Sequence, residues 1–293
     1  INLETQGFNA DFTGTVVDAN APVGVFAGSE ASDAPRFDTL ADRQCCADHL
    51  EEQLFPNDTL GRRFLIGRMP PRSVALNRAF LDPTRDSVGE FDEPEYVRVV
   101  AVESGVTRVE TSLPPPRDVI ELDSEGQLCP AAMDPGPCRS RILVADQDFE
   151  IDADRSIAVL QVLPSQQAVG IPNEYPGGDP AIVAVPPVEQ YREEYVFLTP
   201  NLYAFDFITI VAPREAEILL DEMPLDAFDC EVGPADGIER RMGDPPPSEV
   251  VYRCQFSFPD VIGLPNVRIE DGLQDDGFHT LRATEPVGIV VYG

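Results

Sequence analysis

The sequence contains no lysine and no tryptophan, and its only histidines are His49 and His279. It also has no G-x-S-x-G, H-E-x-x-H, Walker or dinucleotide-binding motif, so most schemes of general-base catalysis lack a candidate group. Each histidine is expected to be a structural, hydrogen-bonded residue, and the protein is expected not to be an enzyme. A glycosidase with two catalytic carboxylates stays open, because some pair among so many acidic residues will lie at a workable separation.

Basic residues are also scarce. The 21 basic residues, all arginine, stand against 52 acidic residues, which gives a formal net charge of −31. A negative field of this size repels phosphate backbones and anionic membranes, so binding to nucleic acid or to a membrane surface is not expected. No apolar run is long enough to span a bilayer, which predicts no membrane insertion. The excess of carboxylates predicts an acidic, solvated surface.

The cysteines lack the C-x-x-C spacing of zinc sites, which favours disulfides over metal thiolates. They are Cys45, Cys46, Cys129, Cys138, Cys230 and Cys254. We expect a disulfide between Cys129 and Cys138, which bracket a loop rich in proline and glycine, and another between Cys230 and Cys254, which bracket a longer acidic excursion. The partners of the first two cysteines stay open. Oxidised cysteines predict an extracellular location, and the start at Ile1 predicts a processed or partial chain.

Short runs rich in valine, isoleucine, phenylalanine and tyrosine recur along the chain between turn residues, which is typical of β-strands. The clearest runs cover residues 97–102, 157–163, 181–185, 207–211, 250–258 and 287–292. The 29 prolines would interrupt most helices, and only residues 39–54 suggest a short one, with Asp38 or Thr39 as its N-cap. The pattern predicts an all-β fold.

A repeat of about 130 residues runs through these strands. Residues 19–25, 153–159 and 283–289 are three similar segments, each a tight turn followed by an apolar strand. A constant offset of 131 residues relates Pro56, Leu60, Phe64 and Ile66 to Pro187, Tyr191, Tyr195 and Phe197, and Asp48 to Asp179. Residues 97–101 match 208–212 at an offset of 111, which places an insertion within residues 67–95 of the first unit. This segment is expected to be a surface excursion.

The repeat predicts two homologous units, each like a β-sandwich or a barrel, that arose by internal duplication. The first covers residues 1–150 with its insertion at 67–95, and the second covers residues 151–293. The third copy of the turn and strand is expected to supply a closing strand for the second unit. Features present in both units, namely Asp48 with Asp179 and Pro56 with Pro187, are expected to hold the fold, the aspartates by capping backbone turns.

One acidic cluster suggests a metal. Asp146, Asp148 and Glu150 would share one face of a strand, with Phe149 and Ile151 pointing into the core. A calcium ion would relieve the repulsion among the three carboxylates, although the loop spacing of an EF-hand is missing. A solvated strand face is the alternative. No cofactor other than calcium is expected.

Four segments carry a resemblance to a known family. They are residues 14–17 (GTVV), 21–28 (APVGVFAG), 48–56 (DHLEEQLFP) and 179–191 (DPAIVAVPPVEQY). In this order they resemble the N-terminal domain of IgG Fc-binding protein and its bacterial relatives. The resemblance implies a secreted or cell-surface protein with a binding or adhesive role, often as one module of a longer chain. The acidic, arginine-only composition looks like that of a bacterial member.

The resulting functional hypothesis is an extracellular, non-enzymatic binding or adhesion module whose partner is a protein or a glycan on another surface. The alternative is a structural subunit that self-associates into an extracellular fibre or surface coat through the edges of its β-sheets.

Overall fold

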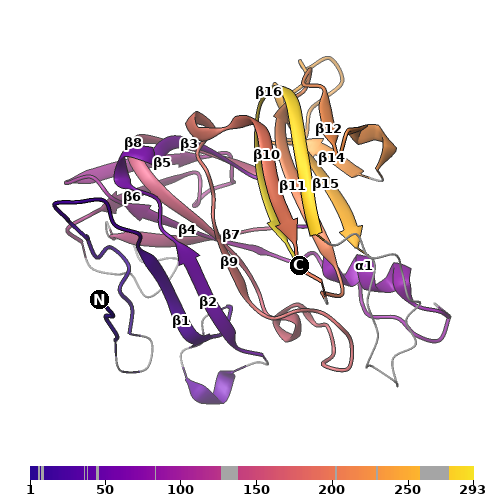
Figure 1. Cartoon of the computed structure of the whole chain (residues 1–293), viewed down its shortest axis with the longest axis horizontal. Helices are drawn as coiled ribbons and strands as arrows, with labels where there is room; N and C mark the ends of the chain where they lie inside the picture. Colours follow the sequence, from indigo (N-terminus) through magenta and orange to yellow (C-terminus); the bar gives the residue numbers. More distant parts are fainter. Residues whose placement is uncertain are drawn as a thin grey trace.

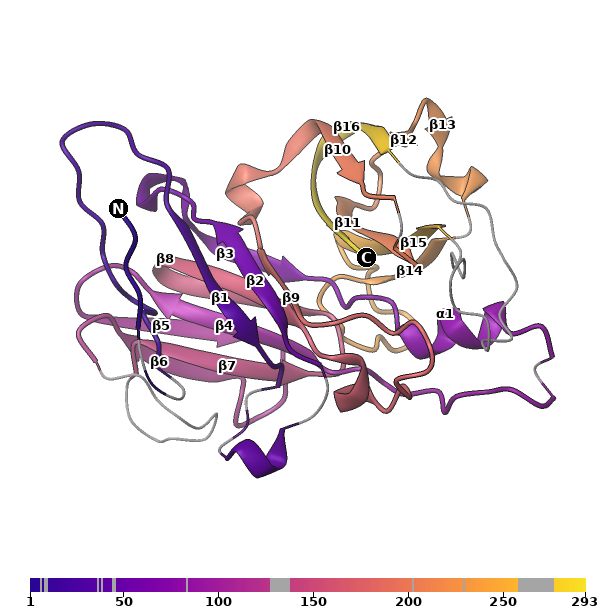
Figure 2. The ribbon, with the colours of Figure 1, turned by 60° about the horizontal axis from the view of Figure 1, so that its bottom comes forward.

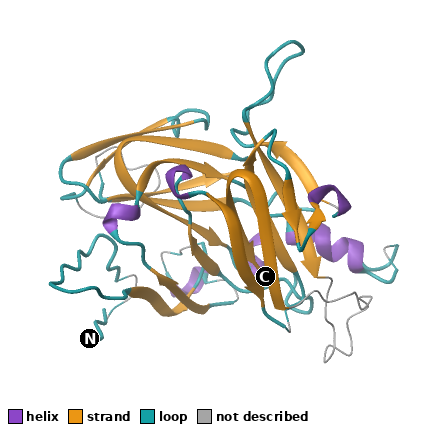
Figure 3. Cartoon of the chain, turned by 45° about the horizontal axis from the view of Figure 1, so that its top comes forward, coloured by secondary structure: helices purple, strands orange, loops and turns teal. Residues whose placement is uncertain are grey.

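A computed structural model of the chain describes all residues except 6, 8, 9, 36, 38, 44, 45, 83, 127–137, 202, 229 and 258–276. The described residues form two curled seven-stranded sheets and one two-stranded sheet, and helices are short (Figures 1 and 3). The predicted all-β class is confirmed. None of the described helices has the length and apolar character needed to cross a membrane.

The first sheet is built around one long strand, β8. Its strands are β3 (Gly61–Ile66), β4 (Glu95–Ala101), β5 (Val106–Thr111), β6 (Val119–Asp123), β7 (Ser140–Ala145), β8 (Phe149–Leu163) and β9 (Ala181–Ala184). They lie in the order β6-β5-β8-β4-β7, and β3 and β9 also pair with β8. Because alternate side chains point to one face, Phe64, Val99, Phe149, Ile151 and Ile157 are all buried in one core.

The second sheet is built in the same way around β16. Its strands are β10 (Arg192–Thr199), β11 (Asp206–Pro213), β12 (Ile218–Leu220), β13 (Met223–Pro224), β14 (Cys230–Pro234), β15 (Glu249–Ser257) and β16 (Gly277–Tyr292). The order is β13-β12-β16-β11-β15-β14, and β10 also pairs with β16. Ile208, Ile210, Leu220, Leu281 and Val287 fill its core. Figure 1 shows the two sheets side by side.

The two sheets share their strand order and their register. The order β6-β5-β8-β4-β7 of the first corresponds to β13-β12-β16-β11-β15 of the second, with β3 and β10 in equivalent places. Val99 pairs with Val159 in the first sheet, and the residues at the predicted offsets, Ile210 and Ile289, pair in the second. The internal duplication stays a prediction, and this shared register supports it. The predicted boundary at residue 150 falls inside β8, so a division by sheets would lie between β9 and β10 instead.

The expected surface excursion at residues 67–95 is wrong for its first half, residues 67–80, which are largely buried, whereas most of residues 81–92 are exposed. The segment does lie in the long connection between β3 and β4, but it contains α1 (Arg72–Ala79), which packs Leu76 and nearby Phe80 against Val169, Ile171 and Phe207. These apolar contacts outweigh the polar, proline-rich composition on which the prediction rested. Figure 2 shows α1 beside the second sheet.

The short helix expected within residues 39–54 is also wrong. Only a single 3-10 turn, η1 (Leu40–Asp42), forms there, and the rest of the described segment contributes β2 (Asp48–Gln53), which pairs with β1 (Phe26–Ser32). Thr39 precedes η1 without making a side-chain cap. Asp38, the other proposed N-cap, lies outside the described residues. Backbone pairing with β1 is the tertiary contact that overrides the weak helical pattern.

Candidate functional site

The predicted calcium ligands do not come together. Asp146 is exposed, whereas Asp148 is buried and Glu150 is partly buried. Arg253 pairs with Asp148, and Arg63 pairs with Glu150 at 2.5 Å, so guanidinium groups already neutralise two of the three carboxylates. No three potential metal ligands cluster in the part of the chain that the structure describes. The structure therefore gives the calcium prediction no support.

The face that carries Asp148 and Glu150 is a contact between the two sheets. Arg253, in the middle of β15, donates from Nη2 to Asp148 Oδ1 and from Nε to the carbonyl of Arg68 at 2.9 Å. The backbone N–H of Arg68 donates to the same Asp148 Oδ1 at 2.7 Å. A buried charge is tolerated when it is paired and hydrogen-bonded, as it is here. The expected solvated face is thus the docking face of the first sheet.

A second arginine bridges the sheets nearby. Arg63 of β3 pairs at 2.5 Å with Glu150 in its own sheet and at 2.9 Å with Glu249 of β15. Burial works to raise the pKa of Glu249, but hydrogen bonds from Ser248 and Arg63 outweigh it and hold that pKa below its usual value. Glu249 is therefore ionised at neutral pH, which keeps this bridge in place.

A second buried ion pair holds α1 beside the first sheet. Arg72 pairs with Glu93 at 2.9 Å, and both side chains are at most 6% exposed. Arg72 also donates to the carbonyls of Gly177 at 2.7 Å and Pro164 at 2.9 Å. This fork of donors is a geometry that arginine supplies and lysine does not.

Glu95, at the start of β4, is a buried carboxylate with a shifted pKa. Its Oε1 accepts the backbone N–H of Met69 at 2.7 Å, and its Oε2 accepts Gln161 Nε2 at 2.6 Å. Burial is the main cause that raises its pKa to about 7, and the two hydrogen bonds only partly offset it. The protonation of this carboxylate therefore changes between mildly acidic and mildly basic conditions.

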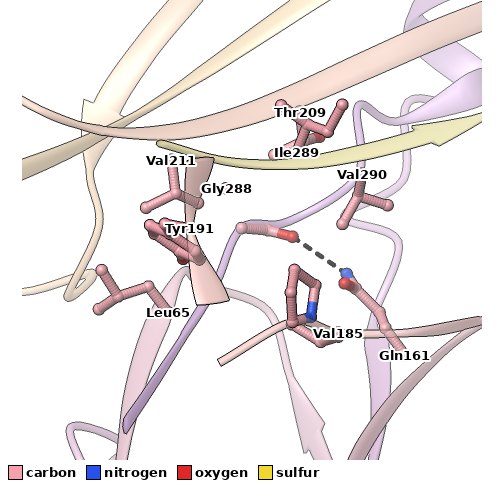
Figure 4. Close-up of a pocket in the computed structure, with 11 residues that line it drawn as sticks. Leu65, Gln161, Val185, Tyr191, Thr209, Val211, Gly288, Ile289 and Val290 are labelled. Carbon is pink, nitrogen blue, oxygen red and sulfur yellow. Dashed lines mark hydrogen bonds between the residues drawn. The ribbon is translucent and has the colours of Figure 1, made fainter. Parts of the chain in front are cut away.

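A small cavity lies between the sheets beside Gln161 (Figure 4). Leu65, Val185, Tyr191, Thr209 and Val290 are among its lining residues. Its volume is about 10 Å³, which holds at most one water molecule. Gln161 donates to the carbonyl of Gly67 at 3.0 Å across it. The cavity is a packing gap of the interface and is too small for a ligand.

His279 lies in an arrangement like that of a catalytic triad. Its Nδ1 is 2.7 Å from Asp221 Oδ2, and its Nε2 is 2.9 Å from Thr199 Oγ1. The imidazole is packed against Phe197 and Phe256, however, and His279 and Thr199 are 2% and 0% exposed. A substrate could not reach the hydroxyl, so this set fits the structural role that we expected for His279. His49, in contrast, is exposed and lies 3.4 Å from Glu51.

The predicted disulfide between Cys230 and Cys254 is confirmed, and it joins β14 to β15. Cys46 and Cys138 each take part in a disulfide as well. The predictions for Cys129 and Cys45 fall outside the described residues.

The residues that the repeat marked as structural occupy equivalent places. Pro56 directly precedes the 3-10 turn η2 (Asn57–Thr59), and Pro187 directly precedes η4 (Val188–Gln190). Asp48 begins β2 and accepts a hydrogen bond from the N–H of His49 at 2.7 Å. Asp179 lies just before β9; burial, followed by the charge of Asp48, raises its pKa. Asp48 and Asp179, which the predicted repeat makes equivalent, therefore lie close together, which their spacing in sequence does not reveal.

An apolar surface is exposed on the second sheet. Val196 and Leu198 of β10 are 67% and 66% exposed, and Phe278 of β16 is 68% exposed. Leu198 pairs directly with Phe278, and Val196 pairs with Thr280, so the three apolar side chains share one face. We call Val196, Leu198 and Phe278 the β10–β16 apolar surface. Contiguous exposed apolar groups of this kind mark interaction sites more often than isolated ones do.

These observations define a class: an all-β, disulfide-bonded protein of two curled sheets docked through one buried and one partly buried ion pair, in which no positive sign of catalysis is found among the described residues. The sequence model of the family described as IgGFc binding protein matches residues 2–293, and the chain belongs to this family. No curated protein and no solved structure matches the chain. Membership suggests an extracellular binding module, as the resemblance implied.

Sequence reasoning missed the inter-sheet network. One signal was present. Arg253 stands within a largely apolar run, residues 250–256, where a charged side chain must find a buried partner. The identity of that partner had no signal, because Asp148 is 105 residues away.

Proposed function

We propose that this protein is an extracellular, non-enzymatic module that binds another protein. The observation that carries the proposal is the family match over residues 2–293, which leaves almost none of the chain for a different function. The disulfide-bonded cysteines support an oxidising, extracellular setting. The strongly negative charge supports a protein partner over a nucleic acid.

We place the binding surface at the β10–β16 apolar surface. Leu198 and Phe278 offer adjacent large apolar side chains, and neighbouring Glu194 and Arg282 provide a charged rim. An apolar centre with a polar rim is the usual anatomy of a protein–protein contact. The buried interface between the sheets, by comparison, offers no room for a partner.

The test is binding of the purified chain to an immobilised immunoglobulin Fc fragment, the probe that the family description names. We expect saturable binding that the double variant Leu198→Ser, Phe278→Ser weakens at least tenfold without lowering the melting temperature by more than a few degrees. Val232→Ser on β14 is the matched control, because Val232 is 52% exposed on the same sheet. No saturable binding, or equal loss in the control, would refute the proposal.

The predicted adhesive role and a glycan partner are more specific alternatives to the proposed protein-binding module. A glycan array probed with the same variants separates them: binding to a glycan that survives the double substitution would contradict a protein-binding apolar surface. The alternative of a fibre subunit predicts ordered filaments of the purified protein in electron micrographs, whereas the binding module predicts dispersed particles.

A further inference from the structure

In the first sheet, the second half of the long strand β8 has a neighbouring strand on each side. The second half of β8 pairs with β4 on one side and with β9 on the other. On the β9 side, Leu160 pairs with Ala184 and Val162 with Ile182, and the N–H of Val185 donates to the carbonyl of Val159 at 2.9 Å. Antiparallel strands expose both backbone groups of alternate residues to the same neighbour, so residues 159, 161 and 163 face β9.

Among the described residues, no strand takes the equivalent place beside the second half of β16. Residues 288–292 pair with β11, as residues 158–162 pair with β4, but no described strand pairs with their other edge. By the shared register, the backbone groups of Ile289 and Val291 point to that open edge. Residues 286–293 carry no charged side chain, although net charge elsewhere in the chain is strongly negative. Charged residues are a common device against pairing at an edge, and this edge has none.

A strand pair of the same kind lies near the N-terminal end of the chain. β2 is the equivalent of β9, and it pairs with β1: Phe26 with Gln53, and Gly28 with Glu51. Residues 22–25 read PVGV, and residues 286–289 at the start of the β16 tail read PVGI. β1 therefore takes the position beside β2 that the tail of a long strand takes beside β9.

We propose that the open edge of β16 at residues 289–292 binds a strand of the β9 kind from another module of this family. The occupant is an extended, uncharged strand with small and β-branched residues, such as the Ala181–Ala184 strand that completes β8. Main-chain hydrogen bonds with Ile289 and Val291 hold it. This edge is the one that the fibre alternative would use, and it is separate from the β10–β16 apolar surface.

The contact between Gly288 and Tyr191 limits how far the docking edge of β16 extends. A Cβ on Gly288 would lie 2.4 Å from the ring of Tyr191, so the backbone there is already covered. Residues 289–292 are partly exposed, whereas the paired strand β11 is buried over residues 206–212. β9 pairs with residues 160–163 of β8, which correspond to residues 290–293 at the repeat offset of 130.

The experiment uses a synthetic peptide of residues 178–187 and the full chain. We expect one peptide to bind per chain, and to slow backbone amide exchange at residues 289–292. Val291→Pro removes an outward N–H while leaving the ladder to β11, and it should weaken binding at least tenfold. Val291→Thr keeps the N–H and should bind within about twofold of the original chain.

Three outcomes would overturn the proposal: no binding to the original chain, equal binding to Val291→Pro, or protection that appears at residues 159–163 because the peptide displaced β9. If Val291→Pro fails to fold, the peptide is instead methylated on the backbone nitrogen of Val183, whose N–H faces the long strand. Equal binding of the methylated and unmethylated peptides to the original chain would then refute the pairing. Binding of the Fc fragment is measured on the same variants, so failure of one proposal leaves the other testable.

Discussion

Replacement of Glu95 by glutamine tests the buried interface between the sheets through its dependence on pH. Burial raises the pKa of Glu95 from 4.5 to about 7. The folded state therefore holds the proton more tightly than the unfolded state does. The stability that this provides is complete below pH 4.5 and is lost as pH rises through about 7. A shift of this size corresponds to roughly 3 kcal/mol, since one pKa unit is about 1.4 kcal/mol.

The assay is urea unfolding of the original chain and of Glu95→Gln at pH 5 and pH 8. Glutamine cannot ionise, and it keeps an oxygen that can accept the N–H of Met69. We expect the loss of unfolding free energy between the two pH values to be smaller in Glu95→Gln, by roughly 3 kcal/mol.

The control is Glu194→Gln, because the side chain of Glu194 is 77% exposed and lies 3.6 Å from Arg282. An exposed ion pair contributes at most about 1 kcal/mol, so this control should keep the pH dependence of the original chain. If Glu95→Gln and the original chain lose the same free energy between pH 5 and pH 8, Glu95 is not the buried titrating group and the reasoning fails.

Two further predictions concern contacts that join distant segments. Arg253→Gln removes the charged partner of the buried Asp148 and should lower the unfolding free energy by roughly 3–5 kcal/mol in urea titrations. Adding Asp148→Asn should restore part of this free energy. A double variant whose loss equals the sum of the two single losses would contradict their coupling. The double variant Cys230→Ser, Cys254→Ser opens a loop with a sequence separation of 24 and should cost roughly 3 kcal/mol. The melting temperature of this variant should lie below that of the original oxidised chain, and no difference between the two would count against a stabilising role.

Much of the fold was predictable because its signals are local. Strands such as β4, β11 and β15 appear as short apolar runs between turn residues, since the period of two records which side chains enter a core. The predicted offsets also anticipated equivalent pairs, such as Phe64 with Ile151 and Tyr195 with Leu281. Phe149 and Ile151 point into the core as predicted, and each is 0% exposed.

The candidate binding surface was not predictable in the same way. The aromatic and apolar residues of β10 alternate as those of any strand do, and alternation alone does not say which face is covered by other elements. Val196 and Leu198 are exposed because, among the described residues, no element packs over their face of the sheet. The exposure of these two side chains depends on how β10, β12 and β16 are arranged in the curled second sheet, and not on the β10 sequence.

The sequence by itself determined the all-β class, the order of strands along the chain and one disulfide, because each depends on spacing or on alternation along a short segment. Only the tertiary structure decided that Asp148 pairs with Arg253 of the second sheet, that Glu150 pairs with Arg63 of its own sheet, that α1 is packed against both sheets, and that no described strand pairs with the outer edge of residues 288–292. Alternation shows that one face of a strand is polar, but it does not show whether water, an ion or another sheet lies against that face.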